Sequence, residues 1–227
     1  MTADAMTLTD AGLETVLLFD ERLDLPHFAA FPLLEDPVGR AAMRRYFTGF
    51  LELAQVQGVG AVLATPTWRA NADWGALLGH DARALDAANA AAVAFVRDVA
   101  AGAAAVLVEG AIGPRGDGYV VGERMTPEAA EACHSAQVRS LRDAGADRVS
   151  AMTLTYADEA IGVVRAAAAA GVPIVPSFTV ETDGRLPDGT DLGDAVALVD
   201  AETDGSALAW MVNCAHPEHV APGLARS

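Results

Sequence analysis

The sequence is poor in positive charge and has no long apolar run. Against 31 Asp and Glu residues it has only 15 Lys and Arg, so its formal net charge is -16. This balance argues against nucleic acid and against an anionic membrane surface as partners, because both are bound through clustered basic side chains. No apolar stretch approaches the length of a membrane span, so we expect no membrane-embedded segment.

The sequence is also poor in cysteine and in targeting or linker segments. Cys133 and Cys214 are the only two cysteines, too few for a disulfide framework. The start, MTADAMTLTD, lacks the basic residues and the apolar stretch of a signal peptide, so we expect a cytoplasmic protein. No Ser/Gly/Pro-rich linker or shift in composition divides the chain, and 52% hydrophobic residues suffice for a sizeable core. We therefore expect residues 1–227 to form a single domain.

The chain does contain a regular alternation of short apolar runs and helical patterns. Strands are expected in the runs MTLTDAG, GAVLATPTW, AAVLVEGAIGP, DRVSAMTLTY, VPIVPSFTV and ALAWMVNC. Helices are expected over 37–57, 83–101, 157–170 and 191–200, and within the run 125–145. In that run we expect Thr126 as the N-cap, Pro127 at the first helical position and Gly145 as the stop. Strands that are apolar throughout and alternate with helices predict a parallel sheet covered by helices.

Two parallel-sheet architectures compete, an open doubly wound sheet and a β/α barrel. The open sheet loses support because the first strand leads into DAGLETVLLF instead of a G-x-G-x-x-G turn. The barrel gains support because polar residues follow nearly every strand, as they do in the active sites of barrel enzymes. These residues are Asp10, Thr65, Thr67, Glu109, Thr153, Thr155, Ser177, Thr179, Asn213 and Cys214. We predict a TIM-type (β/α)8 barrel of which about six units are present, so that the domain is C-terminally incomplete.

Five separated runs resemble, in order, the motifs of the homocysteine S-methyltransferase family. They are TDAGLET, GVGAVLATPTWRAN, VEGAIGPRGDGY, SFTVETDGRLPDG and MVNCAHP. The resemblance implies a β/α barrel that binds zinc through three cysteine thiolates. Cys214 matches the first of these, and no later adjacent cysteine pair is present in the chain.

The implied chemistry follows from the ligands. Zinc holds a thiol as the thiolate, and three protein sulfurs leave one tetrahedral position for the sulfur of a substrate. That sulfur can attack a methyl group on a sulfonium or quaternary ammonium donor by in-line displacement, with no strict need for a general base. Without the motifs, Cys214 reads as a small buried hydrophobic residue at the end of an apolar strand.

Two positions bear on the choice of acceptor. Asp10 matches the family's acidic residue that holds the amino group of the substrate, although a turn carboxylate at a helix start would look the same. Met152 stands before Thr153 where the family has a Glu-Thr pair whose glutamate also grips the amino acid. We therefore expect homocysteine to bind weakly or another thiol to be preferred.

Other residues have both a functional and a structural interpretation. His216 could be a second metal ligand, but capping of a helix start or exposure to solvent is favoured. Glu109 could bind a cationic donor or a helix N-terminus, Glu14 could be a salt-bridge partner, and Cys133 is expected to be structural. The run GPRGDGY lacks the spacing of a phosphate loop and is expected to form a tight turn that lines the site.

Two functions from different classes remain at this point. The first is a zinc-dependent S-methyltransferase whose partners are a small thiol, such as homocysteine, and a methyl donor. Its substrate-binding residues would be Asp10, Thr65, Thr67, Glu109, Thr153, Ser177 and Asn213, with Cys214 as a zinc ligand. The second is a non-catalytic small-molecule-binding remnant without metal. Unpaired edges of the first and sixth strands invite association, so we expect the chain either to self-associate as a homo-oligomer or to be only marginally stable.

Overall fold

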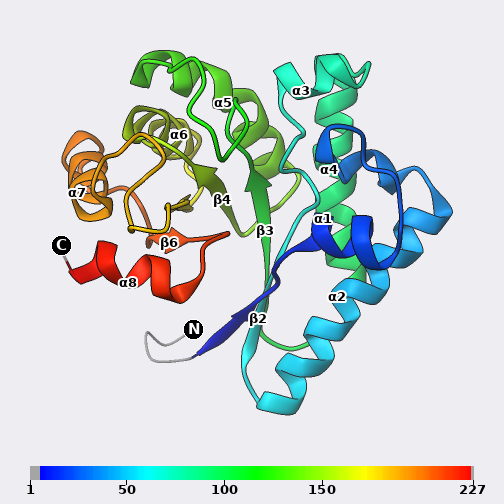
Figure 1. Cartoon of the computed structure of the whole chain (residues 1–227). Helices are drawn as coiled ribbons and strands as arrows, with labels where there is room; N and C mark the ends of the chain where they lie inside the picture. The colour runs from blue at the N-terminus through cyan, green and yellow to red at the C-terminus, as the bar shows by residue number, and fades with distance from the viewer. Residues whose placement is uncertain (1–5, 226–227) are drawn as a thin grey trace. The chain divides into compact units, whose positions relative to one another are not determined.

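The computed structural model describes residues 6–225, and the side chains of residues 6–224. The chain forms two compact units. Unit 1 contains the residues up to 111 together with 140–148, and unit 2 contains 112–139 together with the residues from 149 onward. Each unit consists of parallel strands joined by helices, as the sequence predicts (Figure 1).

Unit 1 is built on strands β1 to β3, which lie in chain order. Thr7 pairs with Gly60 and Ala61 pairs with Val106, both in parallel register. The elements are β1 (Thr7–Thr9), α1 (Leu13–Thr15), a π-helical turn (Val16–Asp20), two 3-10 turns (Pro26–Phe28 and Phe31–Leu34), α2 (Pro37–Gln57), β2 (Gly60–Ala64), α3 (Ala72–Leu77), α4 (Ala82–Val99) and β3 (Val106–Ile112).

Helix α2 shows how local sequence sets the limits of an element. Its N-cap Asp36 accepts hydrogen bonds from the N–H groups of Val38 and Gly39, and Pro37 occupies the first helical position, where its missing N–H costs nothing. Gly58 ends the helix in the left-handed conformation, with φ of 66°. The apolar face of α2 buries Met43 and Phe47 completely.

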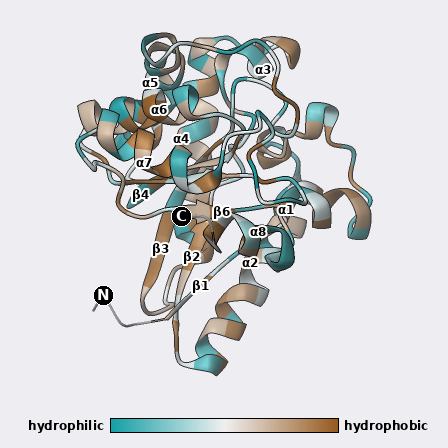
Figure 2. Cartoon of the chain, turned by 60° about the vertical axis from the view of Figure 1, so that its left-hand side comes forward, coloured by the Kyte–Doolittle hydropathy of each residue, from teal (hydrophilic) through white to brown (hydrophobic). Residues whose placement is uncertain are grey.

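Unit 2 is built on strands β4 to β6, again in chain order. Val149 pairs with Ile174 and Ser177 pairs with Met211, both in parallel register. The elements are α5 (Pro127–Asp143), which begins in this unit, β4 (Arg148–Leu154), α6 (Ala157–Ala170), β5 (Ile174–Phe178), α7 (Leu192–Glu202), β6 (Met211–Val212) and α8 (Pro217–Ala225). Every residue of β5 is buried, and Figure 2 shows hydrophobic colouring along the strands, notably β3.

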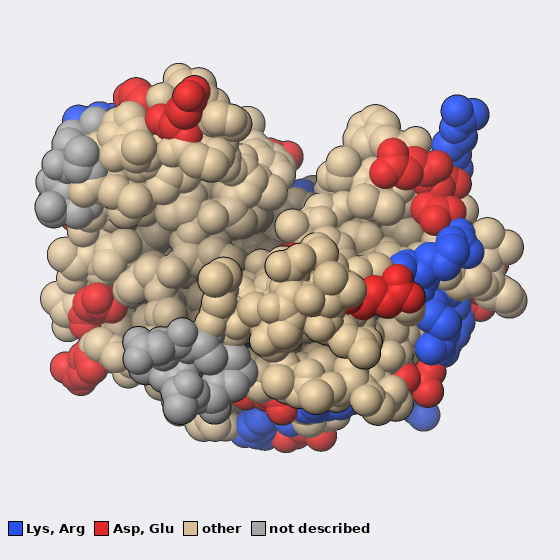
Figure 3. All heavy atoms as spheres, turned by 90° about the horizontal axis from the view of Figure 1, so that it is seen from below, with Lys and Arg blue, Asp and Glu red and all other residues tan. Residues whose placement is uncertain are grey.

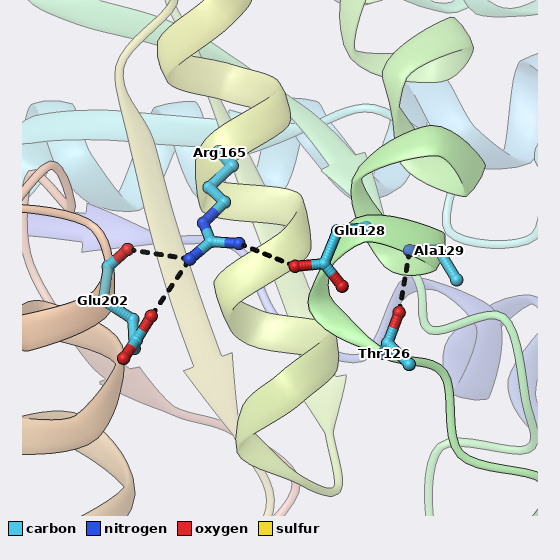
Figure 4. A network of polar contacts seen from close by, with 5 residues as sticks. All are labelled: Thr126, Glu128, Ala129, Arg165 and Glu202. Atoms are coloured by element: carbon cyan, nitrogen blue, oxygen red, sulfur yellow. Dashed lines mark hydrogen bonds and ion pairs between the residues drawn. The ribbon is translucent and has the colours of Figure 1, made fainter.

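A partly buried arginine links three helices of unit 2 (Figure 4). Arg165 of α6 lies 3.5 Å from the carboxylate of Glu128 in α5 and 3.1 Å from that of Glu202 in α7, and it also donates to the Glu202 carbonyl oxygen. Thr126 caps α5, because its hydroxyl accepts a hydrogen bond from the Ala129 N–H at 3.3 Å, as predicted from the sequence.

The helical predictions hold well, but the prediction for the last strand needs correction. Helices over 37–57 and 157–170 are confirmed residue for residue. The run ALAWMVNC was expected to be a buried strand, yet β6 contains only Met211 and Val212, and both are partly exposed. A turn at residues 203–205, in which Asp204 and Gly205 adopt positive φ values, is followed by irregular chain up to residue 210, so the strand starts late.

The surface carries charges of both signs. Figure 3 shows basic and acidic side chains next to each other on the face seen from below, and exposed pairs such as Arg44 with Asp98 and Arg45 with Glu21 have this character. Among residues 6–225, no helix has the length and apolar character needed to cross a membrane.

Candidate functional site

Asp10 follows β1 and is held on both carboxylate oxygens. Oδ1 accepts a hydrogen bond from the Ala64 N–H at 2.7 Å, at the end of β2. Oδ2 accepts one from the hydroxyl of Tyr46 at 3.0 Å, and Tyr46 comes from α2. A main-chain turn follows, in which Gly12 adopts a φ of 74°. The carboxylate is therefore fixed in place by two neighbouring elements.

The charge of Asp10 has no compensating cation among the side chains that the structure describes. No ion pair of Asp10 exists among residues 6–225. Burial raises the pKa of Asp10 to about 7, against the two hydrogen bonds that favour the ionised form, and the carboxylates of Glu109 and Glu14 add to the rise. Burial also raises the pKa of Glu14, while the positive charge of Arg69 opposes that change. A group of this kind favours binding of a positively charged ligand.

The predicted salt-bridge role of Glu14 has no counterpart in the described part of the chain, where Glu14 forms no ion pair. Glu109, by contrast, is paired. Its carboxylate lies 2.5 Å from Nε of Arg148, and both side chains are largely buried. The expectation that Glu109 stands at a strand end is wrong, because β3 continues for three further apolar or small residues to Ile112.

Thr65 and Thr67 lie just after β2 and are fully buried. Their hydroxyls are 2.6 Å apart, Thr67 donates to the Ala111 carbonyl oxygen at 2.7 Å, and the Ala111 N–H donates to Thr65 at 3.0 Å. These contacts tie the end of β2 to β3. The two threonines thus form a structural link, and the prediction that they bind substrate is untested.

In unit 2, Asn213 organises the ends of β4, β5 and β6. Its Oδ1 accepts hydrogen bonds from the Thr153 N–H at 2.9 Å and from the Ser177 hydroxyl at 2.6 Å. Since both donors occupy the oxygen, the amide nitrogen is directed the other way and donates to Sγ of Cys214 at 3.3 Å. Three of the predicted site residues therefore lie together next to the predicted zinc ligand.

The backbone of this cluster is strained at two residues that are not glycine. Thr153 has a φ of 60° and Cys214 a φ of 55°. A β-branched residue in the left-handed region is rare, and such a conformation costs about 1–3 kcal/mol. The ladder between β4 and β5 shifts register between Ala151 and Leu154, at the same place. Strain of this kind is concentrated at functional sites.

The metal-binding prediction can be tested against the residues present. Cys214 is exposed, so the interpretation of a buried hydrophobic residue is wrong for it. Among residues 6–225, however, no group of three or more His, Cys, Asp or Glu side chains is arranged to hold a metal ion. The described residues therefore supply one thiolate and do not by themselves fit a three-thiolate zinc site. Cys133 is partly buried within α5, and its expected structural role is untested.

His216 has the structural role that the sequence favours. Its ring Nδ1 accepts a hydrogen bond from the Glu218 N–H at 3.2 Å, at the start of α8, and 62% of the side chain is exposed. Met152 lies within β4 and is partly exposed.

Sequence reasoning missed the residues that support the predicted ones. Tyr46 lies in the expected helix over 37–57, and Arg148 lies near the start of the expected strand DRVSAMTLTY. Their partners lie 36 and 39 residues away in the chain, a separation at which no local pattern signals a contact.

An apolar hollow of about 840 Å³ in unit 2 lies between α7, β6 and α8, and none of the predicted site residues lines it.

The fold of the chain is similar to that of a solved enzyme structure. The chain is similar to the homocysteine methyltransferase MmuM from Escherichia coli, at 24% sequence identity. The metallated form gives a TM-score of 0.81, with 99% of this chain and 80% of that chain covered. The apo form gives 0.73, with 99% and 78% covered. This likeness confirms the predicted α/β fold of the TIM-barrel type. A search of curated protein sequences gives no match.

A model of the homocysteine S-methyltransferase family matches residues 7–227, which is nearly the whole chain. The match confirms the resemblance carried by the five sequence motifs. The chain therefore belongs to the homocysteine S-methyltransferase family.

Proposed function

We propose that the protein transfers a methyl group from a sulfonium or quaternary ammonium donor to the thiol of an amino acid such as homocysteine. The observation that carries the proposal is the carboxylate of Asp10, fixed by Tyr46 and the Ala64 N–H and without a cation among the described residues. An α-amino acid brings an ammonium group, which is the partner that such a carboxylate lacks.

Each residue of this cluster has a definite task in binding. Asp10 pairs with the ammonium group of the acceptor. Burial and the adjacent Asp10 raise the pKa of Tyr46 above its ordinary value, so its hydroxyl remains a hydrogen-bond donor to the carboxylate. Because Asp10 has a pKa of about 7, the bound ammonium also stabilises its ionised form.

The reaction is a displacement at carbon. The acceptor sulfur, as thiolate, forms a bond to the methyl carbon, the bond from that carbon to the donor sulfur or nitrogen breaks, and the donor leaves with the electron pair and one positive charge fewer. The proton of the acceptor thiol goes to solvent. Cys214 is the residue that would bind zinc, with its sulfur fixed by the Asn213 amide, but one thiolate does not make a catalytic zinc site. We also propose that the protein acts in the cytoplasm.

Binding measurements with a matched pair of ligands test the acceptor site. L-homocysteine and 4-mercaptobutanoate differ in the α-amino group, so the wild-type chain should bind homocysteine more tightly. Asp10→Asn should remove this preference, and the exposed Asp20→Asn should retain it. If both thiols bind equally to the wild-type chain, Asp10 does not hold an ammonium group.

A second candidate is a small-molecule-binding protein without catalysis. It is favoured by one observation, the lack of a three-ligand metal cluster in the described part of the chain. Zinc analysis of the purified 227-residue chain, combined with a methyl-transfer assay, separates the candidates. Less than one zinc per chain and no transfer from S-methylmethionine would favour the second candidate. A stoichiometric zinc that Cys214→Ala removes, together with transfer, would exclude the second candidate.

A further inference from the structure

Glu159 is a buried carboxylate that plays no part in the acceptor site. It lies in the first turn of α6 and is only 1% exposed. Its Oε1 accepts a hydrogen bond from the backbone N–H of Arg115 at 2.7 Å and lies 3.0 Å from Nε2 of His134, which is also 1% exposed. A buried carboxylate that is bonded in this way fixes its two partners in place, here the main chain at Arg115 and the ring of His134.

The position of Glu159 follows from the close packing of α5 and α6. A Cβ at Gly162 would lie 2.4 Å from Cβ of Ala130 and 2.6 Å from the Pro127 carbonyl oxygen, so only glycine permits this approach. Glu159 lies three residues before Gly162, and His134 lies four residues after Ala130, so each is on the contacting face of its helix. The helices therefore bring this carboxylate and this imidazole together.

The direction of the side chain is unusual for its place in the helix. A glutamate at the third helical position commonly reaches back to the N-cap N–H in a capping box. The N-cap of α6 is Tyr156, which makes no side-chain capping bond. Glu159 instead reaches the main chain of the segment that follows β3.

The same turn of α6 also holds the far end of that segment, residues 113–126. The Tyr156 hydroxyl accepts a hydrogen bond from the Met125 N–H at 3.1 Å. The guanidinium of Arg124 lies 5.6 Å from the centre of the Tyr156 ring and 3.1 Å from Asp188. Segment 113–126 is thus fixed at both ends by residues 156 and 159, while Tyr119 and Val120 between them are exposed.

We propose that Glu159 is a positioning residue, which fixes segment 113–126 through the Arg115 N–H so that the segment can contribute to methyl-donor binding. The donor part of this inference rests on the proposed function. Its structural basis is that segment 113–126 leaves the carboxyl end of β3, the end at which β/α barrels build their sites. His134 supports the carboxylate through its Nε2. Its Nδ1 has no hydrogen-bond partner among the described residues, so His134 makes no hydrogen bond to the segment through that atom.

Hydrogen exchange measured by mass spectrometry tests the structural part. In Glu159→Ala, peptides from segment 113–126 should exchange about tenfold faster or more, because the Arg115 N–H loses its acceptor. Glu159→Gln keeps an acceptor oxygen and should restore most of the protection. Glu128→Ala removes an exposed carboxylate from the neighbouring helix and is the control. Unchanged exchange in 113–126, or equal acceleration in the β5 peptides, would show that Glu159 does not position this segment.

Binding of S-methylmethionine tests the functional part with the same variants. Its affinity should fall about tenfold or more in Glu159→Ala, stay near the wild-type value in Glu159→Gln, and not change in Glu128→Ala. Unchanged affinity in Glu159→Ala, with accelerated exchange, would overturn the donor role alone. If the wild-type chain binds neither S-methylmethionine nor homocysteine, the proposed function fails, and the exchange result still decides whether Glu159 positions the segment.

Discussion

Asp10 in unit 1 and Asn213 in unit 2 both follow short strands, but they are held in opposite ways. Asp10 is a charged group with two hydrogen bonds, no cation among the described residues, and a pKa raised to about 7 by burial. Asn213 is a neutral group whose oxygen has two donors and whose nitrogen has an acceptor, next to two residues in strained conformations.

This difference separates a binding group from a framework group. The Asp10 carboxylate has electrostatic energy left to gain from a ligand, so its replacement should affect binding more than folding. The Asn213 amide has little left to gain, and its replacement should affect folding first, because buried donors lose their acceptor. Substitution of Asp10 should therefore change ligand affinity more than stability, and substitution of Asn213 should change stability more than ligand affinity.

The largest effect on stability is expected for Asn213→Ala. The Thr153 N–H and the Ser177 hydroxyl would both lose their acceptor, and the free energy of unfolding should fall by about 2–3 kcal/mol in urea titration. Asn213→Asp keeps an acceptor for both donors and should lose less. Equal losses in the two variants would contradict the framework role.

The next effect concerns the acceptor. If a glutamate at position 152 can grip the amino group, as the family motif implies, Met152→Glu should strengthen homocysteine binding by about tenfold, equivalent to roughly 1.5 kcal/mol for a charge-assisted contact. The affinity for 4-mercaptobutanoate should not rise. A parallel change for both thiols would show that residue 152 does not contact the amino group.

A smaller effect links Asp10 to the pH dependence of stability. Its pKa is higher in the folded chain than in the unfolded chain, so the folded state loses stability as pH rises from about 4 to 7. Asp10→Asn should equal the wild-type chain at pH 4 and exceed it at pH 8, by on the order of 1 kcal/mol after allowance for solvent access. Thermal melts at the two pH values measure this, and a variant less stable at pH 8 would contradict it.

The smallest effect is expected at the exposed pairs of Arg165. Arg165→Gln removes contacts with Glu128 and Glu202 and should lower the free energy of unfolding by about 0.5 kcal/mol or less in low salt, and by less in high salt. Urea titration at two salt concentrations checks this. A loss comparable to that of Asn213→Ala would mean that Arg165 is a main support of unit 2.

The sequence predicts the elements better than the contacts between them. Periodicity and caps place the helices over 37–57 and 157–170, since these signals are local. The length of β6, the Glu109–Arg148 pair and the Tyr46–Asp10 bond depend on residues far apart in the chain. Motif resemblance identified Asp10 and Cys214 as candidates, and the position after a strand identified Asn213. Neither signal showed that the Asn213 amide donates to the sulfur. Self-association stays a prediction.

The proposed function depends most on the binding of the acceptor's ammonium group by Asp10. Its most direct test is an NMR titration of the Asp10 carboxyl carbon with pH, in the absence and the presence of saturating L-homocysteine. We expect an Asp10 pKa of about 7 in the free chain and a clearly lower pKa with homocysteine, but no decrease with 4-mercaptobutanoate. A pKa that homocysteine leaves unchanged, under conditions in which it binds, would contradict the account.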